Sequence, residues 1–511
     1  MSNLTSHLPD ALAVNDHTAK LWVEQQIWGH RLHNDQTPWL LLLEAIGVMA
    51  HLAKSGTLFT GLEKPGNHEV FTYNIAIRQD LRAILFKDRH IEEIAESNLF
   101  SDQSRWSNWY ERLSVDDAKR LSYLQERFTS FTGFRNAVTL LRSAEVEADR
   151  KRRASSRHLS PRGPDMMTAD YGEPKKKGNQ PGKDRRFFAR GGELLYLMLN
   201  RSHRRSELRE LVQTRLLSAK SRWNALAKLL QPSQEQTPEL SFDNVGYLPL
   251  PHHQVYDLIA EDWLAVLSLK ALPDDSLPDP LMRLTGLGII QYMTRRSAEI
   301  VDKEPPVFPI AMVSIETVAV QKLSKDCFAR HRDQSRDAVG KLVDDLVCSD
   351  DWAAALGQQN PLQAVKSLLK NRFMFECSEN VIEKIPEAVR EEAIGDHEMH
   401  LGRVVGFYAE QIGMAASRRG SGRWYAASDA LLEALVLANV TVPMEFEMFL
   451  DRLWQRYRLV VGIDAAKAAF STSNYTHHKA NQRLLEERLR ILGLAKRLSD
   501  DCAFVINPFH G

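Results

Sequence analysis

The most apolar run of the chain limits its fold more than any other feature. This run, TPWLLLLEAIGVMAHLA, covers residues 37–53, is bounded by polar residues and carries Glu44 in its middle. A helix that crosses a membrane needs about 20 predominantly apolar residues. We therefore expect a helix that is buried inside a protein core, with Thr37 as its N-cap and Pro38 in its first turn.

Helical periodicity dominates the remainder of the chain. The segment AKLWVEQQIWGH (19–30) has the spacing of a one-faced helix, and 108–153 contains at least two more helices, broken near Thr132–Gly133. Strand-type alternation is rare, and the best candidates are EVFTYNIAI (69–77) and FVINP (504–508). The sequence therefore predicts a mainly α architecture.

The length of the chain predicts several domains. A chain of 511 residues exceeds what one hydrophobic core usually organises, and its content of 43% hydrophobic and 26% charged residues is that of a globular protein. We expect a multi-domain helical scaffold. Its segments are an N-terminal helical domain (1–148), a basic linker (149–190), a central helical domain (191–375), a second helical domain (376–460) and a winged-helix-like module (461–511).

The cysteines indicate a reducing compartment. Cys327, Cys348, Cys377 and Cys502 are widely scattered and form no CxxC pair, a pattern that favours structural thiols over a zinc knuckle. The N-terminal residues contain neither a basic n-region nor a long apolar h-region, so a signal peptide is not expected. The sequence thus predicts a cytoplasmic protein without a membrane span.

The charge pattern changes abruptly between Asp149 and Arg190. This segment holds thirteen Lys or Arg and five Asp or Glu, a net charge of +8 in a chain of formal net charge zero, so the rest carries −8. Few apolar residues are available to bury, and we expect the segment to be mobile. It is either a solvated linker that docks on acidic surface or a basic arm that contacts phosphates without sequence preference. The candidate phosphate contacts are Arg150, Lys151, Arg152, Arg153, Lys175, Lys176, Lys177, Lys183, Arg185 and Arg186.

A basic helix follows this segment. Gly191–Gly192 is expected to form the turn before a strongly apolar helix, and the second helix begins with Arg201, Arg204 and Arg205. Leucines at 208, 211, 216 and 217 supply the buried stripe of that second helix. The three arginines are expected to extend the basic patch toward nucleic acid.

The C-terminal segment has the element order of a winged helix. GIDAAKAAF (462–470) predicts a short helix, YTHHKANQRLLEERLRILGL (475–494) a longer helix ended by Gly493, and the residues around Asp500–Asp501 two short strands. Helix, turn, helix and hairpin in this order resemble the winged-helix fold. The resemblance covers about fifty residues and rests on the pattern of elements.

The longer helix is the presumed recognition helix. It carries Lys479, Arg483, Arg488 and Arg490, and Asn481 and Gln482 are suited to phosphates or base edges. Two glutamates at 486 and 487 lie among these cations, which is unusual for a helix in a DNA groove. Because winged helices also serve as protein-contact modules, both interpretations stay open.

A glycine-rich loop gives a further candidate contact. In SRRGSGRWYAASD (417–429), Arg418, Arg419 and Arg423 flank two glycines and precede a Trp–Tyr pair, an arrangement that can clamp a phosphate and stack a base. The alternative is a connection between two helices whose aromatic residues return to the core. In that case Ser428 or Asp429 caps the next helix.

Signals for catalysis or metal binding are weak. His397 and His400 share one face of a helix and could hold a metal, but no third ligand is identifiable. The pairs His252–His253 and His477–His478 are weaker, because adjacent residues diverge on a helix. Asp102 with DAK at 117–119 has the letters of a nuclease motif, but the region predicts helix instead of the required strand. No Walker-type loop or nucleophile elbow occurs, so we expect no enzyme, no cofactor and no metal.

Two stretches suggest a class of protein. FFARGGELLYLML (187–199) and RWYAASDALLEALVLANV (423–440) resemble helical accessory proteins of bacterial anti-phage clusters, including phosphorothioation-dependent restriction systems. The absence of catalytic motifs, the basic segment and the winged-helix-like tail predict a non-catalytic DNA-associated scaffold subunit that acts with a separate ATPase, helicase or nuclease. The resemblance implies partnership with an ATPase or helicase and a role in sensing or restricting foreign DNA. The alternatives are a protein-interaction scaffold without nucleic-acid contact and a cryptic metal-dependent nuclease that uses His397 and His400.

Overall fold

The computed structural model confirms that the protein is mainly helical. Helices make up most of the residues that the structure describes, and the strands are few and short. The structure describes residues 21–60, 73–76, 88–98, 101–147, 154–156, 191–230, 239–242 and 247–510, apart from positions 31, 33, 35, 89, 114, 144, 219, 220, 313, 419, 421, 472–474, 500 and 501. Within these ranges, none of the helices combines the length and the apolar character that a membrane span requires.

The apolar run near the N-terminus forms the buried helix that the sequence predicts. Helix α3 covers Pro38–Lys54, and Thr37 Oγ1 accepts a hydrogen bond from Leu40 N at 3.2 Å as its N-cap. Glu44 is fully buried in this helix. The preceding helix α2 covers Glu24–Trp28.

Glu44 is buried because it receives the N-terminus of another helix. Helix α10 (Gly191–Arg201) begins directly against α3, where Gly192 N donates to Glu44 Oε2 at 2.7 Å. Gln36 joins the same contact, since its Nε2 donates to Glu44 Oε2 at 2.9 Å and its Oε1 accepts from Gly191 N at 2.9 Å. A carboxylate is stabilised at this position because a helix N-terminus carries partial positive charge and unpaired N–H groups.

Helix α14 is the centre of the main core. It covers Pro278–Ile300 and is buried along most of its length. Its contacts include α2 and α3 on the N-terminal side of the chain and several later helices. These later helices are α13 (Gln254–Leu267), α15 (Val318–Val347), α19 (Val404–Ile412) and α20 (Asp429–Asn439).

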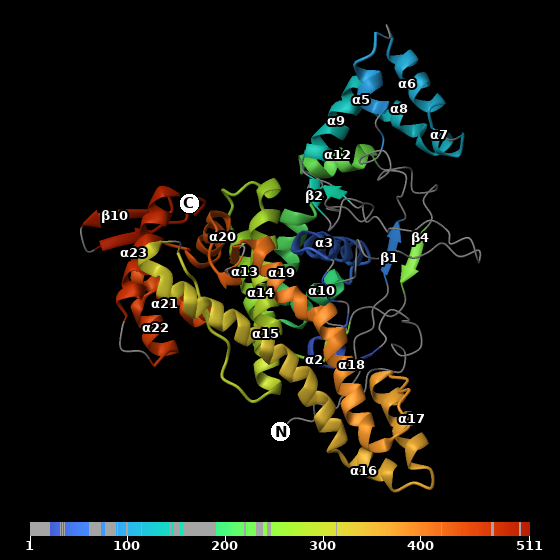
Figure 1. The fold of residues 1–511 in the computed structure, drawn as a ribbon. Coiled ribbons are helices and arrows are strands. Elements are labelled where there is room, and N and C mark those ends of the chain that lie inside the picture. The colour runs from blue at the N-terminus through green and yellow to red at the C-terminus, as the bar shows by residue number, and fades with distance from the viewer. Residues whose placement is uncertain are drawn as a thin grey trace.

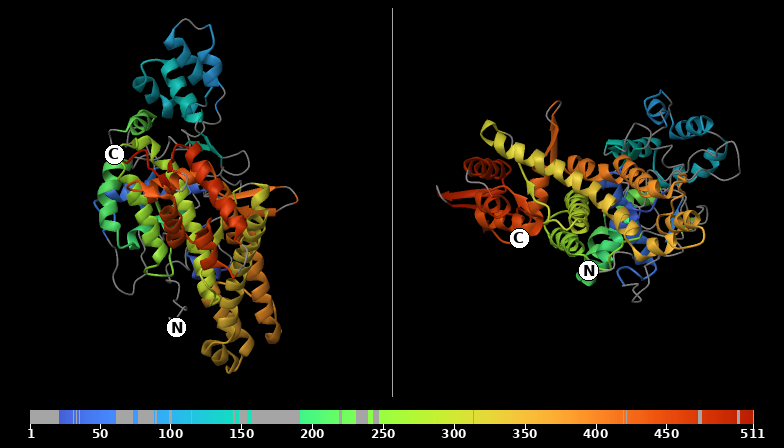
Figure 2. Two further views of the ribbon diagram at one scale, coloured as in Figure 1. Left: turned by 90° about the vertical axis from the view of Figure 1, so that its left-hand side faces the viewer. Right: turned by 60° about the horizontal axis from the view of Figure 1, so that its bottom comes forward.

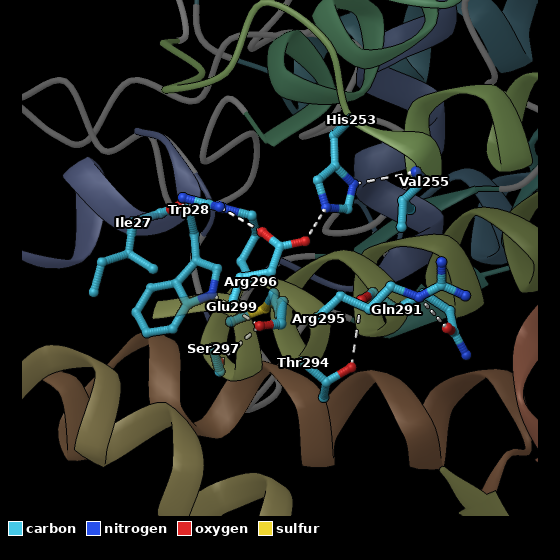
Figure 3. A network of polar contacts seen from close by, with 11 residues as sticks. Ile27, Trp28, His253, Val255, Gln291, Thr294, Arg295, Arg296, Ser297 and Glu299 are labelled. Carbon is cyan, nitrogen blue, oxygen red and sulfur yellow. Dashed lines mark hydrogen bonds and ion pairs between the residues drawn. The ribbon is translucent and has the colours of Figure 1, made fainter. Parts of the chain in front are cut away.

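Polar contacts fix α2 against the C-terminal half of α14 (Figure 3). Trp28 Nε1 donates to Met293 O at 3.0 Å, and Arg296 Nε donates to Ile27 O at 3.3 Å. Both donors are buried, so each bond satisfies a group that has left water.

The same region of α14 holds the start of α13. His253 is the N-cap of α13, where its Nδ1 accepts from Val255 N at 3.1 Å. The other ring nitrogen, Nε2, contacts Glu299 Oε1 at 3.0 Å, and Glu299 also accepts from Arg296 at 2.5 Å (Figure 3). Because Nδ1 is an acceptor, Nε2 carries the proton that is donated to Glu299.

A long helical arm extends from this core. Helix α15 packs against α18 (Ile385–Met399), and α16 (Asp350–Leu356) and α17 (Pro361–Phe373) connect them at the far end (Figure 1). Strands β6 (Ala415–Arg418) and β7 (Gly422–Tyr425) form an antiparallel hairpin that projects from the body in Figure 2.

The C-terminal elements form a small α/β module. They are β8 (Met444–Glu445), α21 (Phe446–Tyr457), β9 (Leu459–Val460), α22 (Ile463–Ala469), α23 (Thr476–Ile491), β10 (Ala495–Ser499) and β11 (Cys502–Val505). The antiparallel sheet has the order β10-β11-β8, and β9 pairs in parallel with β5 (Phe308–Pro309). The two helices and the hairpin predicted for this segment are confirmed.

A second, smaller core lies to one side of the main body (Figure 1). It is built by α5 (His90–Ala95), α6 (Asp102–Glu111), α7 (Val115–Leu121), α8 (Tyr123–Arg127), α9 (Phe131–Ser143) and Leu230 of α12 (Arg222–Leu230). The helix break predicted near Thr132–Gly133 lies earlier, before Phe131, because Ser130 Oγ accepts from Gly133 N at 2.9 Å and starts α9 there.

Two short strand pairs complete the fold. Strand β1 (Tyr73–Ala76) pairs with β4 (Glu239–Phe242), which confirms the strand predicted within 69–77. Strand β2 (Glu145–Glu147) pairs with β3 (Ala154–Ser156). Apart from β3, the predicted linker 149–190 lies outside the described residues.

The main core is a single cluster of buried side chains, and its members come from segments between Leu21 and Val505. It crosses the expected boundaries at 375/376 and 460/461, so the segments on either side of them share one core. Within this core, α10 is followed by α11 (Arg205–Leu211) and by a π-helical turn over Val212–Leu216. Leucines 208 and 216 are fully buried, and leucines 211 and 217 are partly buried, as the predicted stripe requires.

The close contact between α3 and α10 predicts that any side chain at position 192 lowers the stability of the fold. A Cβ at this position would lie 2.5 Å from Ala45 N and 2.6 Å from Glu44 Cβ, so Gly192→Ala forces the two helices apart. We expect a loss of about 3 kcal/mol in the free energy of unfolding, measured by denaturant titration. The matched control is Gly395→Ala on α18, where no heavy atom lies within 4 Å and alanine raises stability by up to about 1 kcal/mol. Equal stabilities for the two variants would contradict this account of the junction.

Burial of His331 predicts a pH dependence of stability. This α15 side chain is 4% exposed and its Nδ1 lies 2.7 Å from Tyr425 Oη; burial, with a smaller effect of Arg330, lowers its pKa to about 3. Below pH 6.5 the unfolded chain therefore binds a proton that the folded chain does not, and stability falls as the pH falls. The free energy of unfolding of the wild type falls when the pH is lowered from 7.5 to 5. We expect this fall to be smaller by about 2 kcal/mol in His331→Phe, which lacks the titrating side chain. The exposed His510→Gln is the control, and an unchanged pH profile in His331→Phe would overturn the assignment.

Candidate functional site

Part of the predicted nucleic-acid surface lies outside the described residues. This applies to Arg150, Lys151, Arg152, Arg153, Lys175, Lys176, Lys177, Lys183, Arg185, Arg186 and Arg419. Their role rests on the sequence alone. The remaining candidates fall into three places: the end of α10, the β6–β7 hairpin and helix α23.

The arginines after α10 do not form one open basic patch. Arg201 is 8% exposed, and its NH1 donates to Leu248 O at 3.1 Å and to Leu250 O at 2.7 Å. It therefore ties the end of α10 to the segment before α13. Arg204 pairs with Glu207 at 2.8 Å, and Arg205 donates to Asn200 O at 3.2 Å. Of the three, Arg204 is the exposed one, and its charge is partly offset by its neighbour.

The glycine-rich segment at 417–429 is a hairpin whose aromatic residues return to the core. Trp424 is 5% exposed and Tyr425 is fully buried. Ser428 Oγ accepts from Leu431 N at 3.3 Å and caps α20. These contacts confirm the alternative in which this segment connects two helices and buries its aromatic pair.

Two arginines of this hairpin differ in their surroundings. Arg418 is exposed near the tip. Arg423 Nε donates to Glu410 Oε1 at 2.6 Å, and its guanidinium lies 5.6 Å from the ring centroid of Phe328. Arg423 therefore holds the hairpin to α19 and α15, and Arg418 is the cation that projects toward solvent.

Helix α23 buries a face that carries two leucines together with His478 and Asn481. Asn481 is fully buried: its Nδ2 donates to Ile310 O at 2.9 Å and Val461 O at 3.1 Å, and its Oδ1 accepts from Met312 N at 2.7 Å. Gln482 contacts Glu447 and Ile463 N. The expectation that Asn481 reads base edges is therefore corrected, because its amide links α23 to the chain around β5 and β9.

Arg488 is likewise fixed within the protein. Its Nε donates to Asp429 Oδ1 at 2.6 Å, and its NH2 donates to Asp429 Oδ2, so the pair is bidentate. Asp429 is the first residue of α20, and the contact joins the two helices. The predicted cations of α23 are thus divided between internal contacts and the surface.

The opposite face of α23 carries the exposed cations. Lys479, Arg483 and Arg490 are exposed and, at positions i, i+4 and i+11, lie on one side of the helix. Arg483 lies 3.8 Å from Glu316 in a loose ion pair. Strand β10 continues the exposed charge with Lys496 and Arg497. Strand β11 pairs with β10, and this hairpin stands beside α23 (Figure 1).

His397 belongs to a buried chain of polar groups. It is 1% exposed; its Nδ1 lies 2.7 Å from Glu24 Oε1, its Nε2 lies 3.0 Å from Ser335 Oγ, and its ring stacks on Trp28. The order acid, imidazole and hydroxyl is that of a nucleophile triad. However, Ser335 lies in the middle of α15, and its hydroxyl also donates to Arg332 O at 2.8 Å. We interpret these hydrogen bonds between Glu24, His397 and Ser335 as a structural link between α2, α15 and α18.

The predicted metal pair is not brought together around a third ligand. His400 is 44% exposed at the end of α18 and contacts Asp396 at 3.6 Å, and His397 points into the core. Asp102, the first residue of the nuclease-like motif, also has a structural role. Asp102 opens α6, and its Oδ2 accepts from Phe131 N at 2.9 Å.

A different histidine cluster was missed by the sequence reasoning. His203, His252 and Asp257 place one ligand atom each within 4.8 Å of one another. Both imidazoles contact Asp257 Oδ2 at 2.9 Å, and the ring centroids are 4.3 Å apart. Among the described residues, this is the group of three that could hold a metal. The pair His252–His253 diverges as expected, but its first member meets a histidine 49 positions earlier in the chain.

Comparison with protein-family models, with curated proteins and with solved structures found no match. The assignment of function therefore depends on the arrangement of residues described above.

The buried position of His397 predicts a large effect of its removal. His397→Ala leaves Glu24, which is 3% exposed, without its imidazole partner, and we expect a loss of about 3 kcal/mol in unfolding free energy. His400→Ala, three residues later on the surface, is expected to change it by less than about 0.5 kcal/mol. Denaturant titrations of both variants test this. Comparable losses at the two positions would show that the Glu24–His397 contact does not hold the helices together.

Proposed function

We propose that the chain is a helical scaffold subunit of a multi-protein bacterial complex and that its C-terminal elements contact DNA as a winged-helix module. In this proposal, the module begins earlier than residue 461. Helix α20, strand β8 and helix α21 supply its first half, and α23 with the β10–β11 hairpin supplies the recognition helix and the wing.

The strand order supports this assignment. In a winged helix, the strand between the first two helices pairs with the last strand of the wing. Strand β8 lies between α20 and α21 and pairs with β11, where Met444 lies opposite Val505 and Glu445 lies opposite Phe504. Strand β9 and helix α22 are then an insertion before the recognition helix.

The exposed cations of α23 and β10 are the observation that carries DNA contact. Asn481 and Arg488 anchor one side of α23 internally, so the other side remains available. Lys479 and Lys496 are exposed on neighbouring elements of the module. Such cations bind phosphates and give affinity without sequence preference. The basic segment 149–190 is proposed to add phosphate contacts to this surface.

The place of the subunit in a complex is proposed from the sequence. The resemblance of residues 187–199 and 423–440 to accessory proteins of anti-phage clusters supports a role in restricting foreign DNA. We assign catalysis in such a complex to a separate ATPase, helicase or nuclease. The chain then orients DNA or a partner subunit without a cofactor of its own.

One observation favours the alternative, a scaffold that binds protein only. Leu498 on β10 is 71% exposed, and Ile491 at the end of α23 is 63% exposed. Large apolar side chains at such exposure on one module are typical of a protein-contact surface. In that case the wing docks on the partner and the cations surround the contact.

Salt dependence of DNA binding distinguishes these functions. The test variant is Lys479→Glu with Lys496→Glu, and the probe is a fluorescent DNA duplex titrated at several salt concentrations. Each lost phosphate contact reduces the slope of log K against log salt by about 0.9, so we expect a reduction of about 2 for the double variant. Binding that weakens equally for unrelated duplex sequences supports contact with the backbone.

The matched control carries the same charge change far from the module. Lys366→Glu with Lys370→Glu lies on α17, at the opposite end of the molecule from α23 (Figure 1), and is expected to bind as the wild type does. A third variant with Lys175, Lys176 and Lys177 changed to Glu measures the share of the basic segment. Absence of duplex binding by the wild type at low salt would reject DNA contact and favour the protein-only scaffold.

A further inference from the structure

We propose that His203, His252 and Asp257 form a binding site for a divalent transition-metal ion. The site goes beyond the proposed DNA contact and is formed by other elements. His203 follows the end of α10, and His252 and Asp257 lie at the start of α13. The ligand atoms are His203 Nδ1, His252 Nε2 and Asp257 Oδ2, all within 4.8 Å of one another.

The carboxylate is oriented before any ion binds. Asp257 Oδ1 accepts from Ser202 Oγ and from His203 N, both at 2.8 Å, and this leaves Oδ2 directed at the two imidazoles. Ligating carboxylates in metal sites are held by outer hydrogen bonds of this kind.

The imidazoles converge on the same point. His203 Nδ1 and His252 Nε2 each lie 2.9 Å from Asp257 Oδ2, and the ring planes are inclined at 51°. Without an ion, both nitrogens are hydrogen-bonded to the same carboxylate oxygen. An ion bound between the three atoms would replace these two hydrogen bonds and accept a lone pair from each imidazole and from the carboxylate oxygen.

The donor set identifies the class of ion. Two imidazole nitrogens and one carboxylate oxygen suit zinc, nickel, cobalt or iron(II), whereas magnesium and calcium prefer oxygen ligands alone. Three protein ligands leave at least one coordination position open. The side chains are 74%, 38% and 24% exposed for His203, His252 and Asp257, so that position faces solvent and is accessible to water or an anionic ligand.

Binding is expected to stabilise the packing of α10 against α13. The ion would join the loop after α10 to the first turn of α13, next to the bonds from Arg201 to Leu248 O and Leu250 O. Because these ligands converge only in the folded chain, the ion binds the native state in preference to the unfolded state. Zinc should therefore raise the melting temperature of the protein.

Zinc titration of the full chain tests the site. Protein stripped with a chelator is titrated with Zn²⁺ by calorimetry, and Co²⁺ is used as a spectroscopic probe of low-coordinate nitrogen and oxygen ligation. We expect one equivalent of saturable binding and a rise in melting temperature. His203→Ala and His252→Ala should each lower the affinity by about tenfold or more.

His400→Ala is the matched control, because it removes a partly exposed histidine from α18 and should leave zinc affinity unchanged. Circular dichroism and melting in chelator verify that each variant is folded. Any one of three results overturns the proposal. The first is that the wild type shows no saturable zinc binding. The others are that the His203→Ala/His252→Ala double variant binds zinc as tightly as the wild type, or that only His400→Ala loses zinc affinity. None of these results bears on the DNA-binding test, so the two proposals succeed or fail separately.

Discussion

The carboxylate of Glu44 at the N-terminus of α10 is the contact on which the arrangement of the main core depends. A buried charge is tolerated only when hydrogen bonds replace its hydration, and Gly192 N and Gln36 supply them. The absence of a side chain at Gly192 lets the backbones of α3 and α10 approach closely. At its other end, α10 is tied through Arg201 to the segment before α13, and His253, the N-cap of α13, contacts Glu299 of α14. A series of polar contacts therefore runs from Glu44 through α10 and the start of α13 to α14.

Local features of the sequence were sufficient to predict several of the elements. Thr37 and Ser428 are N-caps because their side chains accept from backbone N–H groups three residues ahead, a relation that is visible in the sequence. Gly493, with φ of 72°, ends the long C-terminal helix for the same local reason, since glycine adopts positive φ without strain. Strand β1 was predicted from its alternation alone.

The roles of individual polar residues could not be predicted in this way, because they depend on which face of a helix meets another part of the chain. Arg201 and Asn481 have the letters of phosphate or base contacts, but both are buried and bond to backbone groups that lie far away in the sequence. His203 and His252 are 49 positions apart, and their meeting follows from the packing of α10 against α13. A histidine pair is recognisable in a sequence only when its members share one element.

The internal contacts of α23 decide how its surface can be used. Asn481 bonds to Ile310, Met312 and Val461, so the helix is fixed to the β5–β9 pair, and Arg488 fixes it again to α20. The free energy of ordering the helix is therefore supplied by the fold and is not drawn from a ligand. In the function we propose, the cations of this helix keep a constant spacing, which suits the regularly spaced phosphates of a duplex. A bound duplex would then have a fixed direction relative to the long α15–α18 arm, as the proposed scaffold role requires.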